Sequence, residues 1–471
     1  GYIAKNAKGT EYNMVINSEQ AMLGSLLQLV PRHYLSTIGQ FESNGNINFE
    51  ARINGLATDL MHPVVEINFG LKNGRITHPD LAGSLKNVSF DVRFNNGNGI
   101  DDQTAKLELI DFKSFINREP FNLTWEMIGL ENPLINMSLD GKLPLNAVYA
   151  FLGQHVSDGS GWVEIEQIGL SGRMKDMISM ARIPKVKLEG TLHFNRAYLM
   201  VNEIATTFET GTINLANNTF NLQDIQIKTT SSACTLNGTF QNVLPVLLSD
   251  SLNTQNAQLR FRSTLESPQL NLDELLAIGG GHSNQEIQEA VAADKEVLQQ
   301  EVFAQRAFLT SFLEGSFDTD IASLTYGSIS AQNFIGSVNF SKSIMSLKEV
   351  KVDAMQGAFE LNSKIHFDKE PRLELFLDCQ KINIQQCFSQ LNNFNQSVLT
   401  DKNLKGELDA LVKVNLFFDS LGNFKHQDLY VVADVRIKNG ELNNFKMLEN
   451  LASFVKMRDL EQISFTELQN Q

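Results

Sequence analysis

The residue types that most often carry chemistry, namely histidine, cysteine and paired carboxylates, are scattered along this sequence. None of the eight histidines pairs with another at a four-residue spacing, and none neighbours a pair of cysteines, so the usual zinc-ligand patterns are absent. Asp101-Asp102 and Asp318-Thr319-Asp320 lack the ligand spacing and the glycine of a calcium loop. The sequence therefore predicts neither a metal site nor a cofactor.

Two glycine-containing segments resemble catalytic motifs only superficially. Asp158-Gly159-Ser160-Gly161 lacks the Gly-x-Ser-x-Gly spacing and leads into an expected strand at Trp162, so we expect a hairpin turn there. Gly279-Gly280-Gly281 is not followed by Lys-Ser or Lys-Thr, which argues against a phosphate loop and predicts a linker. Because no catalytic constellation is present, the sequence predicts a protein that is not an enzyme.

The cysteines Cys234, Cys379 and Cys387 are too few to form a disulfide framework in a chain of 471 residues. An expected strand-to-helix turn separates Cys379 from Cys387, so a bridge between them is one alternative. Cys379 lies on the apolar side of its strand, however, where a buried thiol is usual. We therefore expect buried thiols.

Apolar and polar residues alternate along most of the chain, which is the pattern of half-buried β-strands. Asparagine and glycine clusters lie between such runs, and we expect hairpin turns at 95–99, 217–218 and 438–440. The sequence therefore predicts a mainly β protein made of antiparallel meanders. The clearest runs are residues 47–53, 65–71, 88–94, 186–194, 373–379, 410–416 and 429–437.

Helical patterns are few and short. One covers residues 18–30, with Ser18 as its N-cap and Pro31 just after its end. Residues 284–312, rich in Glu, Gln and Ala, predict a long charged helix inserted between β segments. We expect this insertion to be a solvated or flexible segment, and a partner-binding helix is the alternative. Further short helices are expected at 146–152, 273–277, 384–391 and 446–455.

A strand led by proline runs into a short apolar helix three times, from Pro133, Pro268 and Pro371, and a glycine-bearing strand follows each time. This recurrence indicates stacked, similar units and an elongated molecule. The expected divisions are a β-groove repeat with an N-terminal helix at 1–153, a second repeat at 154–280, the charged insertion at 281–312 and a C-terminal region at 313–471.

The composition excludes some classes of function. The net charge of −15 argues against a basic surface that binds nucleic acid. The sequence also contains no run of about 20 apolar residues, the length that a transmembrane helix requires. The expected strands carry more apolar surface than the short helices can cover. Either the sheet closes on a packed core, or it forms an open groove for hydrocarbon chains. The 31 Phe against 7 Tyr and 2 Trp suit both arrangements, and the residue pattern alone favours the packed one.

Three segments near the C-terminus follow one another in a specific order. Residues 433–448 read as a strand that ends in a glycine turn and an L-x-N-F-x-x-L motif, residues 451–455 as a short helix, and residues 460–468 contain an I-x-F-x-x-L strand. This order resembles the C-terminal signature of the AsmA-like family. Residues 137–145 resemble the looser body of the same family, so the resemblance extends over most of the chain.

The resemblance implies an open, twisted, antiparallel β-groove with short helices at the ends of its repeats. It also implies a body in the periplasm of a Gram-negative bacterium, anchored to the inner membrane by a helix upstream of Gly1. The family is similar in architecture to TamB and to bridge-like lipid transfer proteins, whose grooves conduct phospholipids between membranes. The implied function is envelope biogenesis, with phospholipid or another acyl-chain lipid as ligand and the outer membrane or its proteins as a further partner.

On this interpretation the inward-facing residues of the clearest strands line the groove. The alternative is a scaffold or assembly factor for outer-membrane proteins, with a closed, dry interior and a partner bound by the sheet edges or by residues 284–312. The expected lining residues are Ile47, Phe49, Val65, Ile67, Phe69, Phe90, Val92, Leu373, Leu375, Leu377, Val412, Val414, Val431, Ala433 and Val435.

Overall fold

The computed structural model describes residues 1–21, 42–45, 47–78, 84–98, 100–152, 155–248, 258–278, 312–367, 371–419, 424–443, 445 and 462–470. Strands make up 71% of these residues, which confirms the mainly β class. The contacts divide the chain into two units, residues 1–225 with 239–257 and residues 226–238 with 258–471. The four-part division expected above stays a prediction. The helices expected at 284–312 and 446–455 lie outside the described residues, apart from Phe312.

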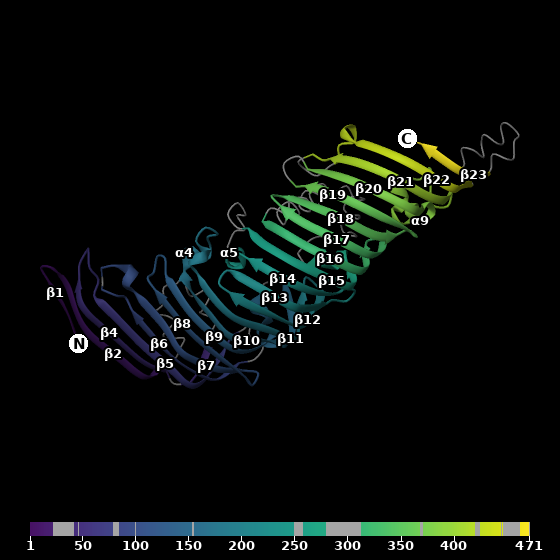
Figure 1. Ribbon diagram of the computed structural model, residues 1–471. Helices are drawn as coiled ribbons and strands as arrows, with labels where there is room; N and C mark the ends of the chain where they lie inside the picture. Colours follow the sequence, from purple (N-terminus) through teal and green to yellow (C-terminus); the bar gives the residue numbers. More distant parts are fainter. Residues whose placement is uncertain are drawn as a thin grey trace. The chain divides into compact units, whose positions relative to one another are not determined.

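The first unit is an antiparallel meander in which most strands pair with the next one in the sequence. The sheet is twisted and curved, and its first and last described strands do not pair with each other (Figure 1). A short strand, β3 (Glu42–Asn44), pairs with β5. The series runs through β1 (Tyr2–Asn6), β2 (Gly9–Ala21), β4 (Ile47–Ala57), β5 (Val64–Thr77), β6 (Leu85–Asn95), β7 (Lys106–Ile116), β8 (Glu119–Ile128), β9 (Leu134–Pro144), β10 (Val156–Arg173), β11 (Lys187–Val201) and β12 (Ile204–Ala216).

The second unit begins with a parallel pair, β15 (Leu259–Asn271) and β16 (Leu313–Tyr326). The strand pairs from β16 to β23 are antiparallel, so this unit is also an open meander. Two strands, β13 (Thr219–Lys228) and β14 (Ala233–Gln241), contain the boundaries between the units. The series continues through β17 (Ile329–Ser341), β18 (Ile344–Ala354), β19 (Gly357–His366), β20 (Arg372–Asn383), β21 (Leu404–Phe417), β22 (Tyr430–Asn443) and β23 (Gln462–Asn470).

Short helices follow the three proline-led strands, as expected. β9 leads into α3 (Leu145–Val148) and η2 (Tyr149–Leu152), β15 into α6 (Leu272–Ile278), and β20 into α9 (Ile384–Gln390). Other short helices are α4 (Met174–Met177), η3 (Ile183–Lys185) and α5 (Val243–Leu247).

The prediction of a helix that begins at Ser18 is wrong for residues 18–21, which belong to strand β2. Strand β2 continues to Ala21, with Ser18 opposite Phe49 and Ala21 opposite Ile47. Cross-strand pairing with β4 therefore overrides the local helical pattern. Residues 22–30 of the expected helix lie outside the described residues.

Many strands contain a β-bulge at a polar residue with positive φ. Each bulge adds one residue to its strand and increases the local twist and bend of the sheet. In four bulges a side-chain oxygen on the neighbouring strand accepts the backbone N–H of the positive-φ residue. The pairs are Asn73 with Ser89 Oγ at 3.1 Å, Gln167 with Asp140 Oδ2 at 3.2 Å, Glu349 with Asn362 Oδ1 at 2.9 Å and Lys381 with Asp409 Oδ1 at 2.9 Å.

Two segments expected as hairpin turns are instead irregular positions inside strands. Residues 438–440 lie within β22, where Asn439 has a φ of 52° and the register with β21 shifts. Residues 158–161 lie within β10, where Gly161 has a φ of 74° and the register with β11 shifts twice. Glycine and asparagine tolerate positive φ in a bulge as well as in a turn, so their presence alone does not mark a chain reversal.

We expect Asp409→Ala to destabilise the second unit by about 1 kcal/mol, because it removes the acceptor at the Lys381 bulge and the carboxylate 3.0 Å from Lys438 Nζ. The Lys381 N–H and then the Lys438 ammonium group lower the pKa of Asp409. A carboxyl group with a lowered pKa contributes stability above its unfolded pKa, about 4, and that contribution is lost as the pH falls further. Urea unfolding at pH 7 and pH 3 measures both effects. An equal deficit at the two pH values would contradict this account.

One carboxylate fastens α6 to the turn between β13 and β14. Glu274 accepts hydrogen bonds from the Ser231 N–H at 2.9 Å, from the Ser232 hydroxyl at 2.9 Å and from the Thr229 hydroxyl. Thr229 and Ser232 are 8% and 6% exposed, so their hydroxyl groups depend on partners inside the protein.

We expect Glu274→Ala to cost about 2 kcal/mol of unfolding free energy, because it leaves these polar groups short of an acceptor. Glu266→Ala, an exposed glutamate of β15 in the same unit, is the matched control and should change the stability little. Chemical denaturation of both variants gives the comparison. If Glu274→Ala lowers the unfolding free energy by no more than Glu266→Ala does, water replaces the carboxylate fully as a hydrogen-bond acceptor, which would contradict the prediction.

Candidate functional site

An apolar surface covers one face of the sheet in the first unit. Phe49 of β4 lies opposite Phe69 of β5, which lies opposite Val92 of β6. The same row continues strand by strand through Leu109, Trp125, Met137, Leu170 and Leu188. Cross-strand neighbours in register share a face, so this row is a continuous apolar band over eight strands.

The next row of the same face is also apolar. It runs through Ala51, Ile67, Phe94, Leu107, Met127 and Ile135. An aromatic contact joins the first row to the buried row beside it: the ring centroids of Phe69 and Phe90 lie 6.2 Å apart in an edge-to-face arrangement. The rows that begin at Phe49 and Ala51 form what we call the apolar face of the first unit.

The apolar face is half-buried over most of its area. Phe69, Leu109, Trp125 and Met137 are each of intermediate exposure, between core and surface. The strands form a single layer (Figure 1), and the described elements that pack against it are short helices such as α3 and α4. Hydrocarbon in contact with these side chains would therefore remove further apolar area from water.

The structure places the seven expected lining residues of the first unit on this one face. Phe49, Val65, Ile67, Phe69 and Val92 are half-buried there. Ile47 and Phe90 are only 0% and 8% exposed and pack with Leu71 and Val88. These two residues belong to the packed core, as do Leu188 and Ala51 of the two rows, which are 5% and 6% exposed, so we remove all four from the accessible surface.

The eight expected lining residues of the second unit also share one face. Leu375, Val414 and Val431 form one row, and Leu377, Val412 and Ala433 form the next. Val435 lies in register with Ala410, and Leu373 with Leu416. All are half-buried except Val431, which is 51% exposed.

The sequence reasoning missed Leu109, Trp125, Met137 and Leu170, which continue the apolar face of the first unit. The alternation that marks the face slips by one residue at the bulges, for example between Leu109 and Phe112. A polar residue such as Asp111, flanked by apolar residues three apart, is the signal that would have revealed this continuation.

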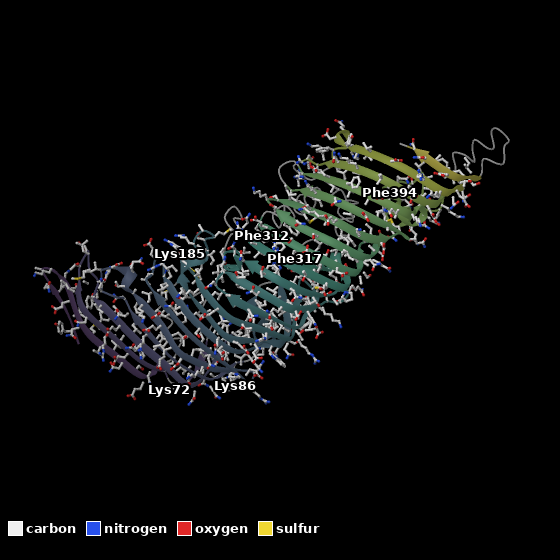
Figure 2. All side chains as sticks on the ribbon, viewed as in Figure 1. Lys72, Lys86, Lys185, Phe312, Phe317 and Phe394 are labelled. Carbon is white, nitrogen blue, oxygen red and sulfur yellow. The ribbon has the colours of Figure 1, made fainter. Side chains whose placement is uncertain are left out.

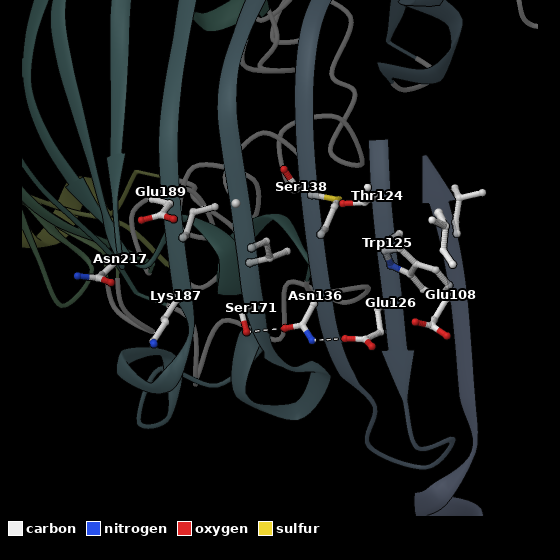
Figure 3. Close-up of a pocket in the computed structure, with 16 residues that line it drawn as sticks. Glu108, Thr124, Trp125, Glu126, Asn136, Ser138, Ser171, Lys187, Glu189 and Asn217 are labelled. Atoms are coloured by element: carbon white, nitrogen blue, oxygen red, sulfur yellow. Dashed lines mark hydrogen bonds between the residues drawn. The ribbon is translucent and has the colours of Figure 1, made fainter. Parts of the chain in front are cut away.

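The opposite face of β7–β11 is polar and contains a shallow hollow of about 480 Å³. Figure 3 shows Glu126, Asn136 and Ser171 in a line across three strands. Asn136 Nδ2 donates to Glu126 at 2.7 Å, and the Ser171 hydroxyl donates to Asn136 at 2.6 Å. Hydrogen bonds from Lys106 and then Asn136 lower the pKa of Glu126. This carboxylate is ionised and fully engaged, which suits a structural polar ladder rather than proton transfer.

The described cysteines are unbridged and unreactive. Cys379 and Cys387 pack in one hydrophobic cluster with Met355 and Ala410, and burial raises the pKa of Cys379 to about 12. A protonated, buried thiol is a poor nucleophile. Within the ranges that the structure describes, no three His, Cys, Asp or Glu residues gather in a metal-binding group.

Comparisons with protein-family models, with curated proteins and with solved structures found no match. Among the described helices, none combines the length and the hydrophobicity that crossing a bilayer requires.

Proposed function

We propose that this protein binds phospholipid or another acyl-chain lipid along its apolar faces and conducts it between the inner and outer membranes, as a component of envelope biogenesis in the periplasm. The observation that carries the proposal is the unbroken apolar row from Phe49 to Leu188 on a single-layer sheet. The resemblance to the AsmA-like family supports the same function.

The dimensions of the row suit an acyl chain. Eight strands spaced about 4.8 Å apart give a row about 34 Å wide. The hydrocarbon core of a bilayer is about 30 Å thick and holds two leaflets, so one acyl chain is shorter than the row. Each buried CH₂ group contributes about 0.8 kcal/mol, which is enough to retain a chain of ordinary length after ordering costs.

Photo-crosslinking tests the proposal directly. A photo-reactive amino acid at Phe69 or Val414 should crosslink to co-purified lipid, and native mass spectrometry of the purified protein should show bound phospholipid. The matched controls are the adjacent residues Asn68 and Lys413, which are exposed on the opposite face and should give no lipid adduct. Protein without bound lipid, and equal crosslinking from both faces, would count against a lipid-binding face and in favour of the scaffold function.

A further inference from the structure

A second candidate site lies on the polar face of the first unit, away from the apolar face. It is a hollow of about 620 Å³ at the ends of β5 and β6 and at the turn between β7 and β8. Three basic residues, Arg75, Lys86 and Arg118, line it together with Ser84, Phe115 and two asparagines, and no carboxylate is among the described residues that line it. Figure 2 labels Lys86 and the nearby Lys72 at this edge of the sheet.

Two of the cations face each other without a counter-charge. Arg75 lies directly opposite Lys86 in the β5–β6 register, and Lys86 lies opposite Phe115. Like charges at opposed positions destabilise a sheet. In the part of the chain that the structure describes, neither side chain forms an ion pair with a carboxylate. An anion between them would relieve this repulsion.

The third cation lies on a turn whose residues have positive φ. Asn117 and Arg118 connect β7 to β8 with φ values of 48° and 76°, a conformation in which glycine is preferred at the second position. Asn117 Nδ2 donates to Asn146 Oδ1 at 3.0 Å and fixes the turn. Equivalent turns have φ values of 66°, 63° and 64° at their second position, which is occupied by Glu203, Ser343 and Gln356. This conformation is therefore common to the hairpins, and Arg118 contributes its charge.

Ser84 borders the hollow but does not present its hydroxyl to it. The residue is 8% exposed and its Oγ is buried without a hydrogen-bond partner among the described residues, so a ligand in the hollow does not reach this oxygen. The groups that the hollow offers to a ligand are therefore the three cations and the asparagine amides.

The strands around the hollow carry an excess of positive charge. Residues 42–44, 71–77, 84–90 and 112–122 contain five basic residues and two acidic residues, Glu42 and Glu119, whereas the whole chain has a net charge of −15. The hollow is therefore a local positive region on an acidic protein, which attracts anions.

We propose that this hollow binds a phosphate group. Guanidinium groups bind phosphate oxygens in pairs, and the ammonium and amide groups supply further donors. The phosphate comes either from a free anion or from the head group of an anionic lipid. This proposal does not depend on lipid binding at the apolar face.

The test uses the full chain and two probes. Isothermal titration with inorganic phosphate, against sodium chloride at equal ionic strength, detects a free anion. Co-sedimentation with vesicles of phosphatidylcholine containing phosphatidylglycerol, compared with pure phosphatidylcholine, detects a head group. We expect Arg75→Gln with Lys86→Gln to weaken binding about tenfold. Arg93→Gln with Lys142→Gln, an equal loss of charge on the same sheet, should leave it unchanged.

A further variant separates ligand binding from a structural role. Arg118→Gly relieves the positive-φ turn and removes one cation, so it should fold at least as stably as the wild type while binding the probe more weakly. Binding of either probe that this variant weakens supports the site, and the responding probe identifies the source of the phosphate. Absence of binding to both probes, equal binding by all variants, or the same response to chloride would overturn the proposal.

Discussion

Val414→Asp is expected to leave the second unit folded and to abolish lipid binding there. Val414 is half-buried between Leu375 and Val431, while its neighbours Lys413 and Asn415 face the other side of the sheet. On an open face, water can reach the new carboxylate, so the melting temperature should fall only slightly. A carboxylate among acyl chains costs several kcal/mol, so bound lipid should be lost. Circular dichroism melting and native mass spectrometry measure the two effects.

The matched control is Lys413→Asp, which places the same carboxylate one residue away on the opposite face of the sheet and should leave lipid binding at the Val414 face intact. Cells that produce the Val414→Asp variant should be sensitive to detergent, and cells that produce the control variant should not. If the face were instead closed in a packed core, Val414→Asp would unfold the unit. A variant that is both stable and fully lipid-loaded would refute an apolar conduit at this position.

Leu71→Ala should destabilise the first unit by about 3 kcal/mol. Leu71 is 0% exposed and packs with Ile47 and Val88, so its truncation leaves a cavity that the neighbours fill only partly. The backbone also approaches closely: a Cβ atom built on Gly74 would lie 2.5 Å from Leu71 Cδ2, so glycine leaves the space that this leucine occupies.

Leu60→Ala is the control for the same chemical change, because Leu60 is 89% exposed and should contribute almost nothing. Urea denaturation of the two variants gives the difference in unfolding free energy. A cost for Leu71→Ala below about 1 kcal/mol would mean that this cluster is loosely packed and collapses into the space.

The sequence predicted the features that follow from local patterns. Period-two alternation identified the strands at Val65 and Leu373, because each strand has one apolar side. The steps from strand to helix after Pro133, Pro268 and Pro371 were likewise predicted, because proline, an apolar run and a change of period occur in the same order each time. The shared face of the expected lining residues followed from the same alternation.

Features that depend on register were not predictable in this way. The sequence predicts a hairpin turn at Asn439, where the structure has a β-bulge, because the same residue types occur at a bulge within a strand and at a turn between two strands. The opposition of Arg75 and Lys86 depends on the pairing of β5 with β6 after the bulge at Asn73. No local pattern specifies which residues meet across two strands.

The parallel pair β15–β16 determines at which end of the strands of the second unit the helices α6 and α9 lie. Each antiparallel pair reverses the strand direction, and a parallel pair keeps it. From β15 to β20 there are one parallel and four antiparallel steps, so both strands point the same way. Helices α6 and α9, which follow them, therefore emerge at the same end.

Hydrogen bonds at the turn between β16 and β17 agree with this count. Asp273 of α6 accepts the Gly327 N–H at 2.8 Å, and the backbone oxygen of Gln390 in α9 accepts the Ser328 hydroxyl at 2.6 Å. An all-antiparallel order would have sent α9 to the opposite end of the strands. The single parallel pair thus places α6 and α9 beside the same turn, between β16 and β17, and neither helix lies at the other end of these strands.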